Sequence, residues 1–175
     1  MTNQTNNINQ INQTNQINQI NHTNHINNTN HINQTNHTNH INKTAIITGA
    51  SRGIGAAIAK KLASCGYNLS LCCRNSSDRL KALADELHCA YGIEVLCYTG
   101  NVGDFFFAKD MVTKTISHFG HIDVLINNAG ISHIGLLSDM TPEEWNNIVA
   151  INLTGVFNFT KLVIPYMVEI GRASC

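Results

Sequence analysis

The chain has 175 residues, and 11 Lys and Arg balance 11 Asp and Glu, so its formal net charge at pH 7 is +0. That length suffices for one domain, and without a basic stripe neither nucleic acid nor a membrane surface is expected as a partner. The chain shows no run of about 18 apolar residues and no charged-then-apolar leader, which predicts no membrane span, no secretory signal and a cytoplasmic location. The 6 Cys lack any Cys-x-x-Cys spacing and are predicted to be reduced, structural thiols.

The N-terminal segment, residues 1–42, differs in composition from the rest of the chain. From Asn3 to Asn42 every third residue is Asn, in triplets of the form Thr/Ile-Asn-Gln/His, and the segment contains no charged Lys, Arg, Asp or Glu. Its few apolar residues cannot offset the entropy of ordering, so we predict a low-complexity, disordered tail prone to self-association. A short-period solenoid is the ordered alternative. Several histidines lie here, but without Cys or a fixed scaffold we expect no metal site.

After this tail, strand-like and helix-like patterns alternate. Residues 45–47 predict a strand, and Ile54, Ile58 and Leu62 then recur at helical spacing up to Gly66. Further segments follow in the same manner: a strand over 69–73, a helix over 78–91, a strand over 94–99, a helix over 108–119 and a strand over 122–126.

The last helix has a capping pattern at its start. Thr141 is the expected cap, Pro142 the first helical residue and Glu144 the reciprocal capping partner. The helix runs to about residue 167 and either tolerates Pro165 or kinks there.

Strands that alternate with helices predict the fold class. We expect an α/β protein, a Rossmann-like, doubly wound parallel sheet with helices on both faces, truncated after the fourth strand and the long helix. Residues 43–169 form this NADP-binding domain. Residues 170–175 are treated as a candidate non-native tail, because they can be read from a sequencing-adapter sequence. In such a sheet, ligands gather at the carboxyl ends of the strands.

The turn after the first strand has the spacing of a dinucleotide-binding motif, Thr48-Gly49-Ala50-Ser51-Arg52-Gly53-Ile54-Gly55. Gly49 permits a tight turn, Gly53 lets the backbone approach a pyrophosphate, and Gly55 lets the helix pack close to the strand. The helix N-terminus favours an anion through its unpaired N–H groups and its dipole. Glycines alone also fit a turn without a ligand, but the flanking strands and helix favour a mononucleotide-binding unit.

Two arginines indicate which dinucleotide this turn prefers. Arg74 directly follows the second strand, where an NAD-binding fold would place Asp or Glu for the ribose hydroxyls. With Arg52 in the glycine turn, two guanidinium groups can reach a 2′-phosphate, whose oxygens match their donors bidentately. We therefore predict NADP(H) over NAD; two solvated surface arginines are the alternative.

Asparagines mark two further positions. Asn127-Asn128-Ala129-Gly130 ends the fourth strand with two amides and two small residues, which suit a ribose or nicotinamide lying against backbone. In the last helix, Asn152 falls at helical spacing on an apolar face. Its buried amide either bonds structural backbone groups or holds a catalytic water. That face is formed by Trp145, Ile148, Val149, Val156 and Phe159.

Residues 43 to about 168 resemble the short-chain dehydrogenase/reductase family, and are similar above all to its bacterial 3-oxoacyl-(acyl-carrier-protein) reductases. The glycine turn, Asn127 to Gly130, and Ile151-Asn152-Leu153-Thr154-Gly155-Val156-Phe157 carry the resemblance in the right order. It implies that Asn101 and Val102 flank adenine, that Asn128 contacts the cofactor ribose, and that Asn152 holds a water in a proton relay. The expected cofactor-binding set is Gly49, Ser51, Arg52, Gly53, Ile54, Gly55, Arg74, Asn101, Val102, Asn128, Ala129 and Gly130.

The resemblance also implies an activity: NADPH-dependent reduction of a carbonyl group, of the 3-oxoacyl-thioester type, to a hydroxyl in fatty acid biosynthesis. The substrate would be a small molecule or bound to a carrier protein, and the intact protein a homotetramer. The family's catalytic Ser and Tyr-x-x-x-Lys pair are not found, since Tyr91 is followed four residues later by Val95 and Tyr166 by Ile170. We therefore expect this chain alone to be inactive. The alternatives are another short-chain alcohol, sugar or steroid dehydrogenase, or a non-catalytic nucleotide-binding fragment.

Overall fold

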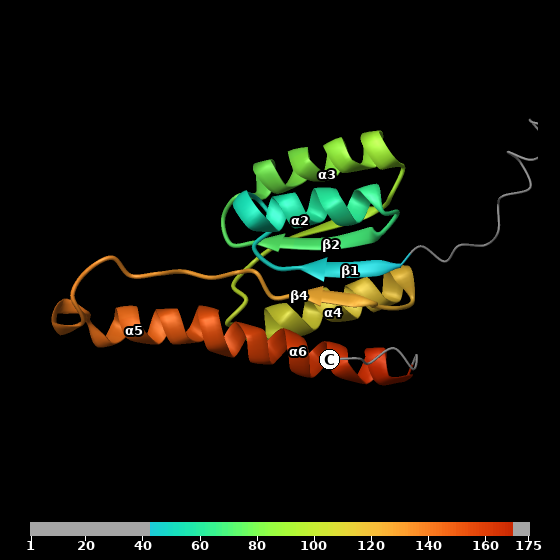
Figure 1. The fold of residues 1–175 in the computed structure, drawn as a ribbon. Helices are drawn as coiled ribbons and strands as arrows, with labels where there is room; N and C mark the ends of the chain where they lie inside the picture. Colours follow the sequence, from blue (N-terminus) through green and yellow to red (C-terminus); the bar gives the residue numbers. More distant parts are fainter. Residues whose placement is uncertain (1–42, 170–175) are drawn as a thin grey trace, which may run out of the picture. The chain divides into compact units, whose positions relative to one another are not determined.

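The computed structural model describes residues 43–169, which form a parallel sheet between two layers of helices (Figure 1). The strands are β1 Thr44–Ile47, β2 Asn68–Cys73, β3 Val95–Thr99 and β4 Val124–Ile126, in the order β3-β2-β1-β4 across the sheet. All neighbouring strands run parallel, with Ile46 paired to Ser70 on one side and to Leu125 on the other. The predicted Rossmann-like α/β fold is confirmed. The predicted disordered tail, its solenoid alternative and the candidate non-native tail lie outside the described residues.

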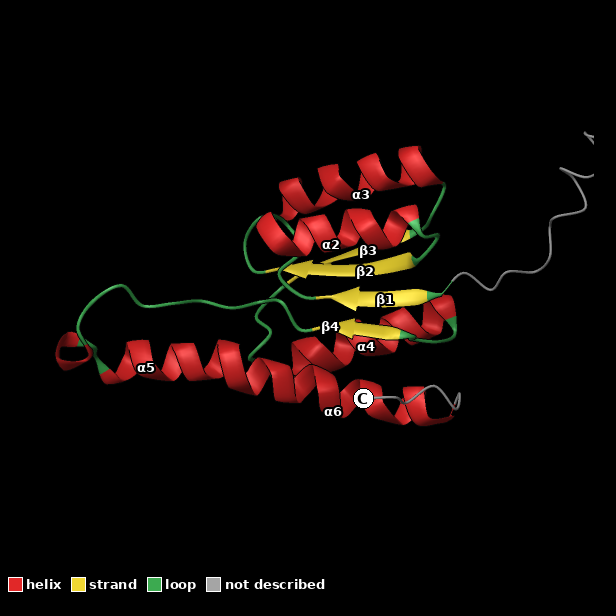
Figure 2. Ribbon diagram, in the orientation of Figure 1, coloured by secondary structure: helices red, strands yellow, loops and turns green. Residues whose placement is uncertain are grey.

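The helices cover the two faces of the sheet in pairs (Figure 2). Helices α2 (Gly53–Ser64) and α3 (Ser77–Tyr91) lie on one face. Helix α4 (Phe105–Phe119) lies on the other face beside α6 (Gly155–Glu169). The three helices predicted before residue 120 are present within a few residues of their expected ends.

Each face of the sheet has its own hydrophobic core, because successive strand side chains point to opposite sides. Ile47 and Leu71 pack with the apolar faces of α2 and α3. Ile46 and Cys72 pack on the other side, with Met111 of α4. Burial on both faces requires continuous apolar strands, as in Ala45 to Ile47.

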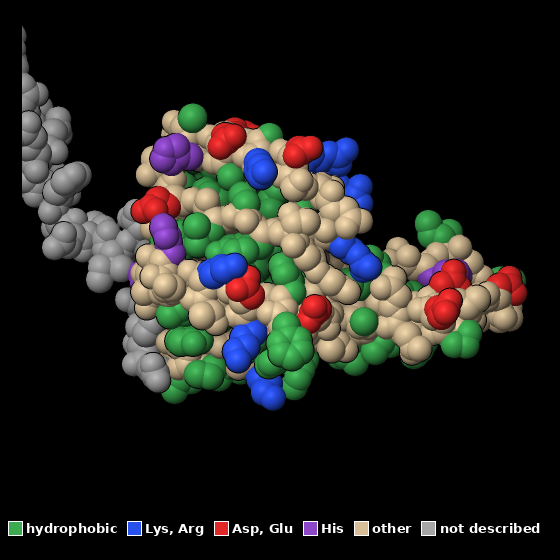
Figure 3. Space-filling view, turned by 180° about the vertical axis from the view of Figure 1, so that it is seen from behind, with side chains coloured by type: hydrophobic (Ala, Val, Ile, Leu, Met, Phe, Trp, Pro, Cys, Tyr) green, Lys and Arg blue, Asp and Glu red, His purple; other side chains and the backbone are tan. Residues whose placement is uncertain are grey.

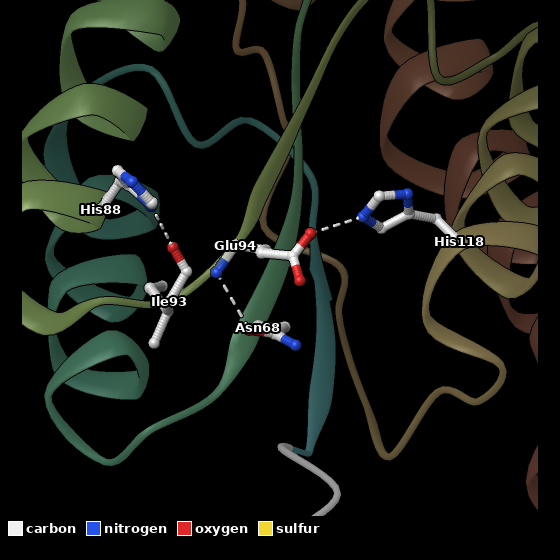
Figure 4. A network of polar contacts seen from close by, with 5 residues as sticks. All are labelled: Asn68, His88, Ile93, Glu94 and His118. Atoms are coloured by element: carbon white, nitrogen blue, oxygen red, sulfur yellow. Dashed lines mark hydrogen bonds and ion pairs between the residues drawn. The ribbon is translucent and has the colours of Figure 1, made fainter.

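The amino ends of the strands are joined by a small polar network (Figure 4). The side-chain oxygen of Asn68 accepts a 3.0 Å hydrogen bond from the backbone N–H of Glu94. The Glu94 carboxylate lies 2.8 Å from Nε2 of His118 in α4, and Nδ1 of His88 in α3 lies 2.8 Å from the carbonyl oxygen of Ile93. These contacts tie β3 to both helix layers at the end of the sheet opposite its carboxyl edge.

The last helical segment is interrupted, although the sequence predicts one continuous helix. Helix α5 (Pro142–Val149) begins with the predicted capping box between Thr141 and Glu144. A π-helical turn, Ala150–Thr154, then leads into α6, which contains Pro165 within its length. A π turn holds one extra residue, so it shifts the register of every side chain after it.

The same segment bears on the expectation of no membrane span. The stretch Pro142–Val168 is long and apolar enough to cross a membrane by length and composition alone. The core helix of a soluble protein passes the same test, and Phe159 and Val163 are fully buried against the sheet layer. The feature is therefore weak evidence for a membrane span.

Candidate functional site

A cleft of about 600 Å³ opens at the carboxyl ends of the strands. Its size falls within the range of roughly 300–1,000 Å³ typical of small-molecule sites. It lies where the chain, having built β2 and β3 on one side of β1, places β4 on the other. Ligands of open α/β sheets bind at such a switch point. The lining residues come from every strand end: Gly49, Ser51, Arg52, Gly53, Ile54, Cys73, Arg74, Asn75, Ser76, Gly100, Asn101, Val102, Asn128, Ala129, Gly130, Ile131 and Ile151.

The glycine turn adopts a backbone that other residues resist. Gly49 has φ 67° and Gly53 has φ 58°, both in the left-handed region. A Cβ at Gly55 would lie only 2.5 Å from the carbonyl oxygen of Gly49, so only glycine lets α2 start this close to the turn. Arg52, the N-cap of α2, makes no side-chain cap, and the first turn has no acidic residue. The first N–H groups of α2 therefore face an anion site without an internal carboxylate.

Thr48 fastens the glycine turn to the end of β4. Its buried Oγ1 accepts hydrogen bonds of 3.0 Å from the backbone N–H groups of Asn128 and Ala129. The side-chain Nδ2 of Asn128 donates in return to the carbonyl oxygens of Thr48 and Gly49, at 2.9 and 3.1 Å. Asn128 thus lines the cleft, but its side-chain N–H groups bind the backbone of the turn. The side-chain oxygen Oδ1 is then the polar atom that remains for a ligand.

The two arginines of the predicted cofactor site lie at the cleft. Arg52 and Arg74 are both exposed and both line the cleft. The end of β2 contributes Cys73, Asn75 and Ser76 as well, which the sequence analysis did not single out. Their signal was their position directly after a strand, since each strand end in this fold meets the same edge.

Asn152 does not lie where its spacing predicts. It is exposed rather than on the buried face, as are Trp145 (54 %) and Val156 (37 %) of the same predicted face. Asn152 lies within the π-helical turn, and Val156 follows the turn in a shifted register, whereas Trp145 precedes it. The side chain of Asn152 clasps the backbone of Ile131: Oδ1 accepts from N–H at 2.9 Å, and Nδ2 donates to the carbonyl oxygen at 2.8 Å. The sequence left two roles open for Asn152, a bond to backbone groups or a hold on a catalytic water. The structure shows the bond to backbone groups.

The buried amide of this helix is Asn158, which sequence reasoning missed. It is 2 % exposed, and its Nδ2 donates to the carbonyl oxygens of Val102 and Gly103, both at 3.2 Å. The available signal was its spacing, because Asn158 lies seven residues after Ile151 and directly before Phe159, both of which are buried.

The thiols of Cys72 and Cys97 are poor nucleophiles near neutral pH. Burial raises the pKa of Cys72 to about 12 and that of Cys97 to about 11. Both thiols stay protonated near neutral pH, and a protonated thiol is a poor nucleophile. The described cysteines are free thiols, as predicted: Cys65, Cys72, Cys73, Cys89 and Cys97.

This cleft defines a class of protein, the parallel α/β domains that bind a ligand over a glycine turn at the sheet's switch point. A family model described as short chain dehydrogenase matches residues 43–174. The chain belongs to the short-chain dehydrogenase family.

Individual relatives agree with this assignment. The chain is 42 % identical over 126 residues to "3-oxoacyl-[acyl-carrier-protein] reductase FabG" of Staphylococcus epidermidis, covering 72 % of this chain and 51 % of that protein. It is 39 % identical over 124 residues to "D-beta-hydroxybutyrate dehydrogenase" of Cupriavidus necator, covering 71 % and 47 %. The chain therefore spans about half the length of the curated relatives it matches.

A solved structure shows the same fold. The alcohol dehydrogenase from the archaeon Thermococcus sibiricus, complexed with 5-hydroxy-NADP, superposes with a TM-score of 0.70 at 37 % sequence identity, covering 74 % of this chain and 55 % of that one.

Proposed function

We propose that the cleft binds NADP(H). The observation that carries this proposal is that Arg52 and Arg74 both line the cleft beside the glycine turn, while no carboxylate directly follows β2. Ser51, Gly53 and the α2 N-terminus would hold the pyrophosphate, Asn101 and Val102 the adenine, and Asn128, Ala129 and Gly130 the nicotinamide ribose. The Thermococcus relative, crystallised with an NADP derivative, supports the choice.

The proposed activity of the intact enzyme is reduction of a carbonyl group to a hydroxyl, on a 3-oxoacyl thioester or a similar small substrate. The cofactor would supply the hydride. Three features support this: the family assignment, the Staphylococcus relative's name and the hydroxybutyrate dehydrogenase, which is named for a related 3-hydroxy acid. Another alcohol or sugar dehydrogenase is the alternative. The proposal includes a cytoplasmic location and a homotetramer, consistent with the exposed Leu153, Phe157 and Ile164.

The residues of this chain supply the proposed cofactor-binding site of this reaction. Asn152 is the proposed catalytic residue of the intact enzyme, and its clasp on Ile131 fixes the backbone at the nicotinamide side of the cleft. No Tyr of the sequence is followed four residues later by Lys. General acid catalysis needs a proton donor within hydrogen-bond reach of the carbonyl oxygen, so this chain alone is proposed to bind NADPH without turnover.

A chimera tests the activity. Residues 43–168 of this chain would replace the matching half of the Staphylococcus reductase, and NADPH oxidation would be followed with an acetoacetyl thioester. We expect reduction with NADPH in preference to NADH, and no oxidation of NADPH by the unaltered 175-residue chain. A folded chimera that prefers NADH, or turnover by the chain alone, would contradict the proposal.

A further inference from the structure

The loop after β3 lies between the cleft and helix α6. We call residues 100–104 the β3 loop; Gly100, Asn101 and Val102 of this loop line the cleft. Val102 is 7 % exposed and belongs to the core between the sheet and α6. One side of this residue therefore meets the cleft, and the other meets the helix.

Asn158 supplies the polar part of that contact. Its amide donates one hydrogen bond to each of two successive carbonyl oxygens, those of Val102 and Gly103, at 3.2 Å. Among short side chains, only an amide offers two N–H donors from one atom without a charge. Buried carbonyl groups that lose their donors are costly, so the loop's backbone is held where Asn158 can reach it.

Close packing surrounds these two bonds. A Cβ at Gly155 would lie 2.9 Å from Cγ2 of Val102, and a Cβ at Gly103 would lie 2.8 Å from the carbonyl oxygen of Ala150. Glycine on each side thus lets helix and loop meet directly. Asn158 lies in α6, three residues after Gly155, and its side chain contacts the loop there.

We propose that Asn158 is a positioning residue for the adenosine half of the cofactor. It fixes the backbone of Val102 and Gly103 from behind, so that the β3 loop presents a preformed wall to a flat heteroaromatic base. This inference rests on the proposed function, because the ligand is the adenosine end of NADP(H). Preorganised walls improve affinity by reducing the ordering required on binding.

The test compares Asn158→Ala with a matched variant in the full chain. Thr160→Val removes the other hydrogen bond of this helix to a strand end, the 3.1 Å contact with Nδ2 of Asn127, without touching the β3 loop. The probes are NADPH and 2′-phospho-ADP-ribose, which lacks the nicotinamide. We expect Asn158→Ala to weaken both by the same factor, about fivefold, the worth of one net hydrogen bond, and Thr160→Val to stay within about twofold of the original chain.

A third variant separates positioning from stability. Asn158→Ser keeps one donor, and its affinity for both probes is expected between those of the original chain and the alanine variant; it also serves if the alanine variant does not fold. A purely structural role would lower the melting temperature but leave the dissociation constants of the folded variants unchanged, which would overturn the inference alone. A folded original chain that binds neither probe would overturn the proposed function and this inference with it.

Discussion

At the scale of single residues, polar side chains at the cleft form hydrogen bonds with the protein's own backbone. Four hydrogen bonds join Thr48 and Gly49 of the glycine turn to Asn128 and Ala129 at the end of β4, and two of them link Thr48 directly to Asn128. The resemblance to the family implies a ribose contact for Asn128, and the geometry shows what its amide does before any ligand arrives. The turn is therefore preorganised, so the cofactor need not order it on binding.

Removing the Thr48 hydroxyl should unfasten the turn. Thr48→Val keeps the side-chain shape but removes the acceptor of the Ala129 N–H, whereas the Asn128 N–H keeps its 3.1 Å bond to the carbonyl oxygen of Ile126. An unsatisfied buried donor costs about 1–3 kcal/mol, so we expect a loss of that size in the free energy of unfolding, measured by urea denaturation. Thr113→Val, at an exposed position of α4, should change it little. Equal losses in the two variants would argue against the role of Thr48.

Arg74 should decide the preference for the 2′-phosphate. Arg74→Asp replaces a guanidinium at the end of β2 with the carboxylate that suits an unphosphorylated ribose. Losing a charge-assisted contact of about 1.5–3 kcal/mol predicts NADPH affinity lowered by about tenfold to a hundredfold, with NADH affinity unchanged or improved. Arg79→Asp makes the same charge change at an exposed site of α3 outside the cleft lining, and should leave the ratio of the two affinities near its original value.

At the scale of elements, the sequence predicted the helices and strands that local residue patterns encode. Apolar strand runs and the spacing of Leu80, Leu83 and Leu87 defined the helices and strands, and Gly92 and Gly120 ended α3 and α4 at positive φ. The π-helical turn was not predicted, because the apolar spacing was interpreted as one continuous α-helix. On that interpretation Asn152 was expected to be buried, and Asn158, seven residues after the buried Ile151, was overlooked.

The capping box of α5 makes this element sensitive to acid. Hydrogen bonds from the backbone N–H and hydroxyl of Thr141, and then nearby His133, lower the pKa of Glu144 below its ordinary 4.5. Because the folded-state pKa is the lower one, Glu144 stabilises the folded chain above pH 4.5, and that contribution is lost as the pH falls through the folded-state value. We expect Glu144→Gln to flatten the decline of stability between neutral and acid pH.

The neighbouring residue is the control for this prediction. Glu143→Gln removes a carboxylate from the same first turn of α5 but not from the capping box. Stability would be followed by urea denaturation at a series of pH values. If both variants show the acid dependence of the original chain, the capping box does not contribute to it.

At the scale of the whole molecule, the chain spans about half the length of the curated relatives it matches, and its described elements are arranged around the cleft. The strand order and the cleft follow from alternating strands and helices, which is why they could be predicted without a structure. Hydrophobic side chains reach the surface along the edge of the unit that α4 and α6 form (Figure 3). The exposed apolar residues of the long helix include Leu153, Phe157, Ile164 and Val168. Such a surface favours association with another apolar surface.

The most direct test of the central claim, that the glycine turn and its arginines bind NADP(H), is a fluorescence titration of NADPH with the full 175-residue chain. We expect a saturable change with one site per chain, competed by NADP⁺ and weakened by Arg74→Asp. A chain shown by circular dichroism to be folded, but leaving NADPH fluorescence unchanged at every concentration, would contradict it.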